Sequence, residues 1–393
     1  MKTLFLVTAF IFISIFSRAQ SASSAATCQH RIGIFAPLYL DSVYHNEVYQ
    51  FGKKFPRFSL QGIDFMQGAQ IALDSFPIKN CIIETYFYDA KSDSLSISKL
   101  IATHQLDQLE MIIGSVKDEE LNLLGDFAKT KKIPFISVTY PNDGGIVNNP
   151  YLIILNSTLK SHCEAIFSYL LQNNSTEKIL HVRQTGSQED RVAGYFNNIN
   201  KPDKKALLNI KTITLDSNFY LIKNQLDSTK KNIIIGGSLD EDFAVSLATT
   251  LSSLKKKYDI LLIGMPNWES FNAFGKNIKE NLKDLPIHFT ASFFNTKDDN
   301  YSKTIQEAYL NNYKGKPSEY SYKGFESVYL YTRILNLYNN EVVDHLNDYP
   351  FQVFTKYNLL PVKLSKLGSI DYYENKHLYL LKKTNGIVEE WVH

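Results

Sequence analysis

The chain has 393 residues, of which 44% are hydrophobic and 21% charged, and its 42 basic and 40 acidic side chains give a formal net charge of +2. This composition argues against a disordered chain, and the charge balance offers no basic surface for nucleic acid. At about 150 residues per domain, the length predicts two or three domains, each with its own core.

The N-terminus has the layout of a secretory signal peptide. Lys2 supplies a positive charge, residues 4–16 form an apolar run, and Ala19 is a small residue at the expected cleavage site. The apolar run is shorter than the roughly 20 residues that cross a bilayer, so a retained membrane anchor is the less favoured alternative. We expect residues 1–19 to be removed and residues 20–30 to form a spacer. The mature protein would then be soluble and either periplasmic or secreted.

Export permits disulfides, and the chain has three cysteines. Cys28 precedes an apolar run at residues 32–37, and Cys81 directly precedes another at residues 82–88. If the two runs are neighbouring parallel strands, both cysteines lie at the same edge of the sheet. We therefore predict a Cys28–Cys81 disulfide with Cys163 free, and three buried thiols are the alternative.

Strands and helices alternate along the first part of the chain. The predicted strands are residues 32–38, 82–88, 111–115, 134–138 and 151–155, and the predicted helices are residues 63–73, 94–106 and 118–129. A polar, aromatic loop is expected after the first strand, up to about residue 60. Strands separated by helices of this length indicate βαβ units and a parallel, doubly wound sheet.

The same alternation returns further along the chain. The predicted strands are residues 178–182, 211–215, 232–235, 259–263 and 288–294, and the predicted helices are residues 160–171, 190–199, 240–254, 301–313 and 325–338. The turn signal Asn385-Gly386 predicts a β-hairpin near the C-terminus. The expected fold class is therefore α/β, with two Rossmann-like sheets of similar size.

The sequence lacks the motifs of common enzyme and cofactor sites. It contains no GxxxxGK[ST] phosphate loop, no GxGxxG after the first strand, no GxSxG elbow, no CxxC pair and no two histidines four residues apart. We therefore expect a binding protein rather than an enzyme, with neither cofactor nor metal.

Candidate binding residues follow from position alone, because ligands of open α/β sheets bind beyond the carboxyl ends of the strands. In the first predicted sheet these positions carry Tyr39, Ser115, Thr139 and Tyr140. In the second predicted sheet they carry Gln188, Ser238, Asn267 and Trp268. Turn formation or helix capping is an equally good reading of each polar residue, and Trp268 would either stack on a ligand or cover the core.

Several segments, taken in order, resemble the type I periplasmic binding proteins, the family of branched-chain amino-acid binding proteins and receptor ligand-binding domains. The resemblance covers nearly all of the mature chain. It rests on residues 32–38 (IGIFAPL), 62–73 (GIDFMQGAQIAL), 112–115 (IIGS), 132–137 (KIPFIS) and 309–330. The PLYLDS and YDAKSDS segments are most similar to cell-envelope members that often accompany a peptidoglycan-binding module.

The resemblance implies two lobes joined by three crossover strands that close on a ligand about a hinge. We expect crossings near residues 153–157, 288–294 and 340–349. The N-terminal lobe would hold residues 31–155 and 286–345, and the C-terminal lobe residues 156–285 and 346–393. In the amino-acid binders, hydroxyls after strands three and four hold the ligand carboxylate, and Ser115 and Thr139 occupy those positions. The acid that binds the ligand ammonium has no clear counterpart after Gly264.

The expected function is therefore capture of a small molecule by an exported solute-binding protein, for transport or sensing. An amino acid, a peptide or another polar solute would be the ligand, and an ABC transporter permease or an envelope protein would be the partner. The alternative is a cell-envelope interaction protein that does not transport and instead regulates peptidoglycan synthesis or remodelling.

Overall fold

The computed structural model describes residues 28–391 except 203–204, 276–277, 349, 351 and 365–367. The predicted signal peptide and most of the predicted spacer lie outside the described residues. The spacer was expected to reach residue 30, but Cys28 already begins the first strand. Among the described residues, no helix is long and apolar enough to span a bilayer.

The first lobe is built on a seven-stranded sheet in the order β13-β14-β7-β6-β5-β1-β4. All strands except the antiparallel edge strand β13 run parallel. Their bounds are β1 (Cys28–Ala36), β4 (Cys81–Asp89), β5 (Met111–Gly114), β6 (Phe135–Ser137), β7 (Leu152–Ile154), β13 (Leu359–Val362) and β14 (Tyr372–Asn375).

Two hydrophobic cores lie on opposite faces of this sheet, because alternate side chains of a strand point to opposite faces. In β1, Ile32, Ile34 and Ala36 pack with helices α2, α8 and α9, whereas Phe35 packs with α3 and α4. The helices are α2 (Arg57–Ser75), α3 (Ile97–Ala102), α4 (Asp118–Lys131), α8 (Asn300–Tyr313) and α9 (Glu319–Tyr338).

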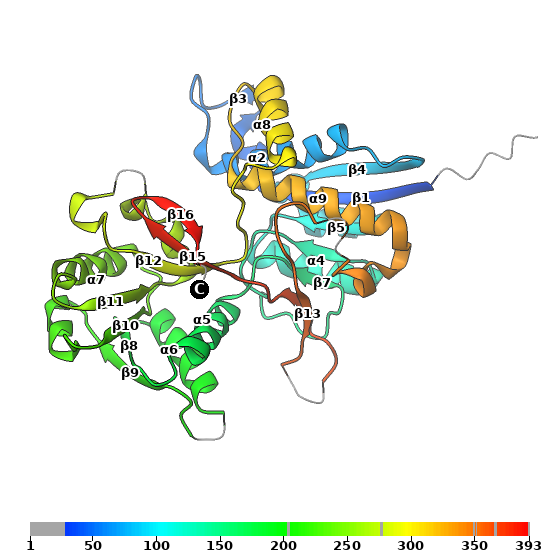
Figure 1. The fold of residues 1–393 in the computed structure, drawn as a ribbon. Helices are drawn as coiled ribbons and strands as arrows, with labels where there is room; N and C mark the ends of the chain where they lie inside the picture. Colours follow the sequence, from blue (N-terminus) through cyan, green and yellow to red (C-terminus); the bar gives the residue numbers. More distant parts are fainter. Residues whose placement is uncertain are drawn as a thin grey trace, which may run out of the picture.

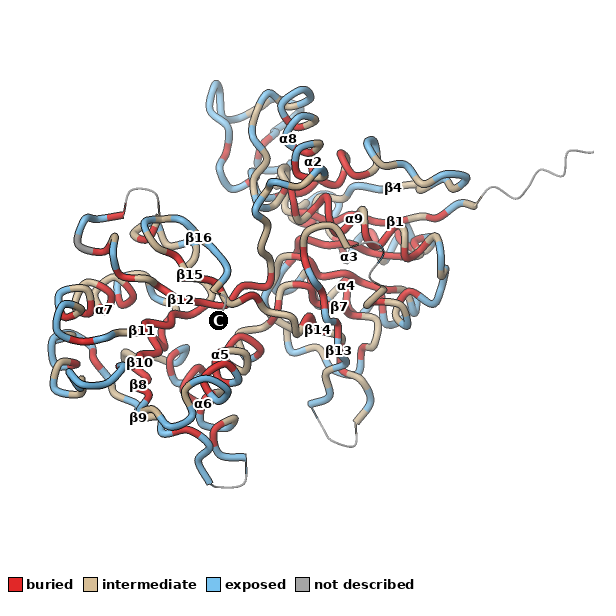
Figure 2. Tube along the Cα trace, viewed as in Figure 1, coloured by how far each residue is buried: buried red, intermediate tan, exposed pale blue. Residues whose placement is uncertain are grey.

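The second lobe repeats this plan with a sheet in the order β16-β15-β12-β11-β10-β8-β9. Its strands are β8 (Lys178–Arg183), β9 (Asn209–Thr214), β10 (Lys231–Gly236), β11 (Asp259–Ile263), β12 (Ile287–Ala291), β15 (Tyr379–Thr384) and β16 (Ile387–Glu390). Its α-helices are α5 (Leu159–Asn173), α6 (Ser187–Asn200) and α7 (Glu241–Leu254). The hairpin of β15 and β16 turns at Asn385-Gly386, as predicted. Figure 1 shows the two lobes, and Figure 2 shows that buried residues run along both sheets.

The chain passes between the lobes three times, as the resemblance implies: from β7 to α5, from β12 to α8 and from β14 to β15 (Figure 1). The third crossing lies after Asn375 and not near residues 340–349, where the 3-10 helix η5 (Asn339–His345) follows α9. The bounds of the two lobes in the structure therefore differ from the expected ones. Strand β12 pairs within the second sheet, whereas β13 and β14 pair within the first.

The polar composition of β14 explains why the sequence reading missed it. Glu374 and Asn375 are both buried at its end, although such residues are typical of loops. Glu374 accepts hydrogen bonds from the Thr158 backbone and the Ser161 hydroxyl, both at 2.7 Å. The two tyrosines that begin this strand pack with the hydrophobic cores, but two aromatic residues followed by two buried polar ones do not form an apolar run in the sequence.

The loop expected between β1 and α2 also contains regular structure. A short helix α1 (Leu40–Val43) is followed by an antiparallel hairpin of β2 (Tyr44–His45) and β3 (Val48–Tyr49). The paired runs are too short to produce a recognisable alternation of polar and apolar residues.

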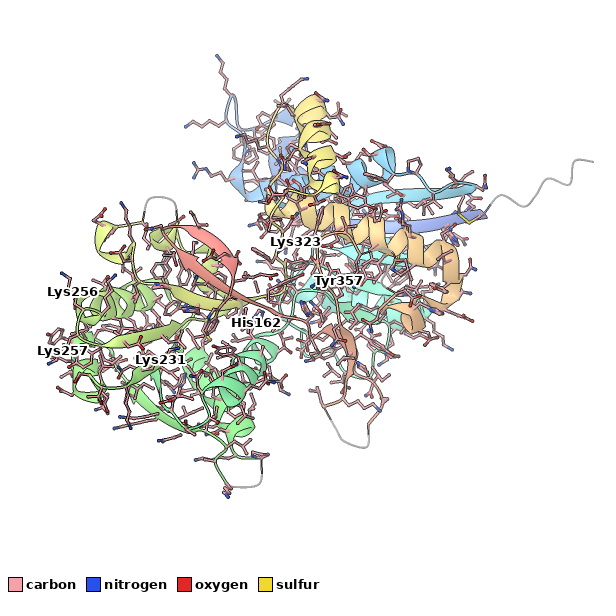
Figure 3. All side chains as sticks on the ribbon, viewed as in Figure 1. His162, Lys231, Lys256, Lys257, Lys323 and Tyr357 are labelled. Atoms are coloured by element: carbon pink, nitrogen blue, oxygen red, sulfur yellow. A yellow bond between two sulfur atoms is a disulfide. The ribbon has the colours of Figure 1, made fainter. Side chains whose placement is uncertain are left out.

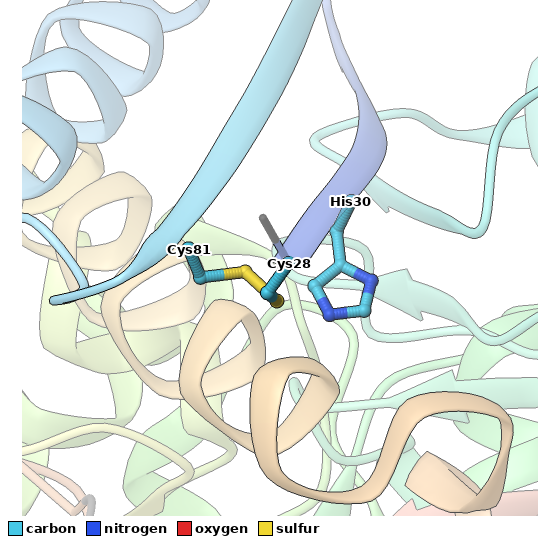
Figure 4. A group of neighbouring side chains, drawn as sticks. All are labelled: Cys28, His30 and Cys81. Carbon is cyan, nitrogen blue, oxygen red and sulfur yellow. A yellow bond between two sulfur atoms is a disulfide. The ribbon is translucent and has the colours of Figure 1, made fainter. Parts of the chain in front are cut away.

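The predicted pairing of cysteines is present. Cys28 and Cys81 lie opposite each other in the parallel register of β1 and β4, and they form a disulfide (Figure 4). Cys163 is free and buried within α5.

Candidate functional site

A cavity of about 170 Å³ opens at the carboxyl ends of β1, β5 and β6 in the first lobe. Its walls include four of the predicted site residues: Tyr39, Ser115, Thr139 and Tyr140. Strand β1 lies between β4 and β5, where the strand order reverses. Open α/β sheets bind ligands at this kind of reversal, because the loops on either side leave in opposite directions and open a crevice.

Hydroxyl groups dominate the polar chemistry of this cavity. The Ser115 and Thr139 hydroxyl oxygens lie 2.9 Å apart, and the Tyr140 hydroxyl donates to an Asp118 carboxylate oxygen at 2.6 Å. Burial, followed by this hydrogen bond, raises the pKa of Tyr140 to about 12, so its hydroxyl stays protonated at neutral pH. Ser115 and Thr139 use one proton between them, which leaves the other proton free to be donated to a ligand oxygen.

The loop after β1 is held in place by Asp89 at the end of β4. Its carboxylate accepts hydrogen bonds from the backbone N–H groups of Leu38, Tyr39 and Leu40 at 2.9, 3.1 and 2.7 Å. Tyr39 adopts a left-handed backbone conformation with φ of 58°. These contacts direct the Tyr39 ring toward the cavity, where it packs edge-on against Phe58 at a centroid distance of 5.2 Å.

The sequence reading missed several other residues of the cavity wall. Lys91 forms an ion pair with Glu120 there, and the wall also includes Phe58 and Tyr320. Burial opposes the charge on Lys91, but the hydrogen bond and attraction from Glu120 outweigh it and raise the pKa of Lys91. Tyr320 comes from α9, far away in the sequence, so only the tertiary fold brings it here. A charged pair formed between the turn after β4 and the first turn of α4 carries no local motif either.

In the second lobe, Trp268 covers the core instead of facing a ligand. The side chain is fully buried, and its Nε1 donates to the Ser238 carbonyl oxygen at 2.8 Å. A Cβ added to Gly236 or Gly264 would overlap the indole. These glycines, at and just beyond the ends of β10 and β11, therefore provide the space that the ring occupies. The stacking role considered for Trp268 is not what the structure shows.

The other second-lobe candidates line neither of two cavities that the described residues form. Ser238 is fully buried and donates to Glu189 at 2.6 Å, while Asn267 donates to the Leu239 carbonyl at 2.6 Å. Gln188 is exposed in the first turn of α6. Neither these three residues nor Trp268 line the first-lobe cavity or the larger cavity at the hinge.

The larger cavity, of about 530 Å³, lies where both lobes meet at the hinge. The first lobe supplies the segment after β12 and the segment before β13, and the second lobe supplies β15 and β16. Its charged wall residues are Asp299, Lys356, Glu389 and Glu390. No sequence signal pointed to it, because its walls come from four separate segments.

Charged groups of the two lobes also influence each other. Glu269 follows Trp268 in the second lobe, and burial, followed by repulsion from Glu319 of α9, raises its pKa. Lys323 on α9, labelled in Figure 3, lies 4.2 Å from the centre of the Phe293 ring. Burial lowers the pKa of Lys323, while Glu319 and Glu269 oppose that shift. The charge of Glu269 in the second lobe therefore interacts with both Glu319 and Lys323 in the first lobe.

No protein-family model and no curated protein matches the chain. Solved structures do match. A branched-chain amino acid ABC transporter protein from Rhodospirillum rubrum aligns at 12% identity with a TM-score of 0.65, covering 93% of this chain and 99% of that one. A branched-chain amino acid periplasmic ligand-binding protein from Burkholderia xenovorans aligns at 12% identity with a TM-score of 0.61, covering 91% of each chain.

A third similar structure is full-length LpoA from Haemophilus influenzae, with 12% identity and a TM-score of 0.58. The alignment covers 93% of this chain and 59% of LpoA. At these identities the comparisons establish architecture, and the two lobes with their three crossings agree with them. The chain has the type I periplasmic-binding-protein fold, as its sequence suggested.

Proposed function

We propose that this protein is an exported, non-catalytic solute-binding protein that encloses a small polar molecule between its lobes for transport or sensing. One observation carries the proposal. Tyr39, Ser115, Thr139 and Tyr140 follow three different strands, yet all line one cavity at the reversal point of the first sheet. Two similar structures are described as complexes with leucine and isoleucine, which supports a ligand of amino-acid size.

The polar groups suggest how such a solute would be held. The free proton of the Ser115–Thr139 pair suits a carboxylate or carbonyl oxygen, and Tyr39 offers an aromatic edge beside it. Closure about the three crossings would bring second-lobe groups such as Glu269 toward the first lobe. Contacts made to both lobes at once are what favour the closed state when the ligand binds.

Thermal unfolding with amino acids, short peptides, sugars and peptidoglycan fragments tests the proposal. A solute at 100 times its dissociation constant adds about 2.7 kcal/mol to the free energy of unfolding. Replacing Ser115 by alanine and Thr139 by valine should weaken binding of that solute about 30-fold, because the one hydrogen bond that the pair can donate to a charged ligand oxygen contributes about 2 kcal/mol. Thr304→Val, on α8 and outside both cavities, is the matched control and should leave affinity unchanged.

If a stabilising solute bound the double variant as tightly as the wild type, the first-lobe cavity would not be its site. If no compound of any class stabilised the protein, solute binding itself would be contradicted.

A second candidate function has one observation in its favour. The indole of Trp268 fills the space at the ends of β10 and β11, where the second lobe would otherwise approach a solute. A second lobe whose strand ends are closed by a buried side chain suits an envelope interaction protein that regulates peptidoglycan synthesis through a partner, and the fold likeness to LpoA is compatible with that role. Recovery of one peptidoglycan synthase from envelope extracts, together with no stabilising solute, would favour this function over the first.

A further inference from the structure

The hairpin between α1 and α2 presents large apolar side chains to solvent. Four of them are well exposed: Tyr44 by 47%, Val48 by 62%, Phe51 by 36% and Phe55 by 52%. We call this group, together with Lys53, Lys54 and Arg57, the basic-aromatic tip. It projects from the end of the first lobe, where Figure 2 shows exposed chain. Exposed apolar side chains gathered in one place mark an interaction surface.

The charge of the tip differs from that of the chain as a whole. Lys53, Lys54 and Arg57 are exposed, and Glu47 in the hairpin turn is the one acidic residue between residues 44 and 57, so the cations outnumber the acids there. None of the three cations forms an ion pair with any other residue in the described part of the chain. In a protein whose net charge is only +2, this is a local excess of positive charge with no internal partner. This positive charge favours a partner that carries negative charge.

Local contacts hold the tip in its exposed shape. Strands β2 and β3 pair at Tyr44 and Tyr49, and the Tyr49 hydroxyl donates to the Lys54 carbonyl at 2.6 Å. The rings of Tyr44, Tyr49 and Phe51 follow one another at centroid distances of 5.7 and 6.1 Å. The paired hairpin and the loop that follows it therefore hold Tyr44, Tyr49 and Phe51 in place.

We propose that the basic-aromatic tip docks the protein onto an anionic phospholipid surface. Aromatic and aliphatic side chains enter the boundary between headgroups and acyl chains, while neighbouring lysines and arginines attract anionic headgroups. The exposed tip side chains line neither of the two cavities described above, and the tip projects from the end of the first lobe. A fluid, extended, negatively charged surface matches both the projection and its charge. The inference does not depend on a solute in the cleft.

Co-sedimentation of the full mature protein with lipid vesicles tests the proposal. We expect binding to vesicles of phosphatidylglycerol mixed with phosphatidylcholine, loss of binding as salt is raised, and little binding to phosphatidylcholine alone. Neutralising two charges in the variant Lys53→Gln with Lys54→Gln should weaken binding about 30-fold, at about fivefold per lysine. Phe55→Ser should also weaken it, by removing the inserted ring.

The second lobe offers a matched control. Lys256 and Lys257, labelled in Figure 3, are also adjacent, exposed and without an ion pair in the described chain, but the aromatic residue next to them, Tyr258, is buried. Replacing both by glutamine should leave vesicle binding unchanged, and all variants should keep the thermal stability of the wild type. Equal binding to both kinds of vesicle, no binding, or equal losses in the tip and control variants would overturn the proposal. Absence of vesicle binding would assign the tip to a protein partner.

Discussion

At the scale of single residues, two buried histidines make stability depend on pH. His162, whose ring bonds the Thr290 hydroxyl at 2.7 Å, and His181 each have a pKa lowered to about 4, chiefly by burial. The unfolded chain holds these protons at the ordinary value of 6.5, so it binds more protons than the folded chain between the two pKa values. Stability from these groups is therefore present above pH 6.5 and is lost as the pH falls toward 4.

We expect each histidine to lower the free energy of unfolding by about 2 kcal/mol between about pH 7 and about pH 4.5. Urea unfolding at both pH values measures this loss. The variant His162→Gln with His181→Gln should lose that part of the pH dependence, whereas His104→Gln, at an exposed position, should keep it. A double variant as sensitive to pH as the wild type would contradict the assignment.

The residue scale also shows how far position predicts a site. Ser115 and Thr139 could be found because parallel strands end at one edge of a sheet, whatever their side chains contact. The burial of Trp268 could not be predicted from the sequence, because it depends on two glycines in different segments, Gly236 and Gly264. The place of Tyr320 in the cavity wall could not be predicted either, since α9 reaches the cavity only after the chain has passed through the second lobe.

At the scale of elements, α2 and α9 touch backbone to backbone. A Cβ added to Gly68 would overlap the Ser321 carbonyl oxygen, and one added to Gly324 would overlap the Phe65 carbonyl oxygen. Gly68→Ala and Gly324→Ala should each lower the free energy of unfolding by about 1–3 kcal/mol or more, because the helices must separate. Gly194→Ala on α6, which meets no neighbouring atom, should be neutral or stabilising by up to about 1 kcal/mol. Thermal unfolding of the three variants compares them directly, and equal effects would contradict close helix contact.

The disulfide joins β1 to β4 across a sequence separation of 53 residues. In the chain-entropy model, closing a loop of this size contributes about 4 kcal/mol, so the Cys28→Ser, Cys81→Ser variant should unfold at a clearly lower urea concentration. Mass spectrometry after alkylation of the unreduced, denatured protein should find one modified cysteine, Cys163. Three modified cysteines would contradict the pairing.

Most elements could be predicted because buried parallel strands read as continuous apolar runs, as at Ile32 to Ala36 and Asp259–Ile263. The exceptions were elements without such a run. Strand β14 ends in buried Glu374 and Asn375, and the hairpin of β2 and β3 has too few residues to show a period. Because β14 pairs within the first sheet, the third crossing follows Asn375 and does not lie near residues 340–349, where it was predicted.

At the scale of the whole molecule, the three crossings form one hydrogen-bonded hinge. The Ser157 backbone donates to the Ser292 hydroxyl at 2.9 Å, and the Ser157 hydroxyl donates to the Asn375 carbonyl at 2.5 Å. Asn375 in turn donates to the Leu155 carbonyl at 3.3 Å. Buried hydrogen bonds between adjacent crossings favour rotation of two rigid lobes over independent bending of three strands.

Solution X-ray scattering tests the central claim, closure of two lobes on a solute, most directly. With a solute that stabilises the wild type in thermal unfolding, the radius of gyration should decrease, and the Ser115→Ala, Thr139→Val variant should need a higher solute concentration for the same decrease. A stabilising solute that leaves the radius of gyration unchanged at saturation would contradict closure of the lobes.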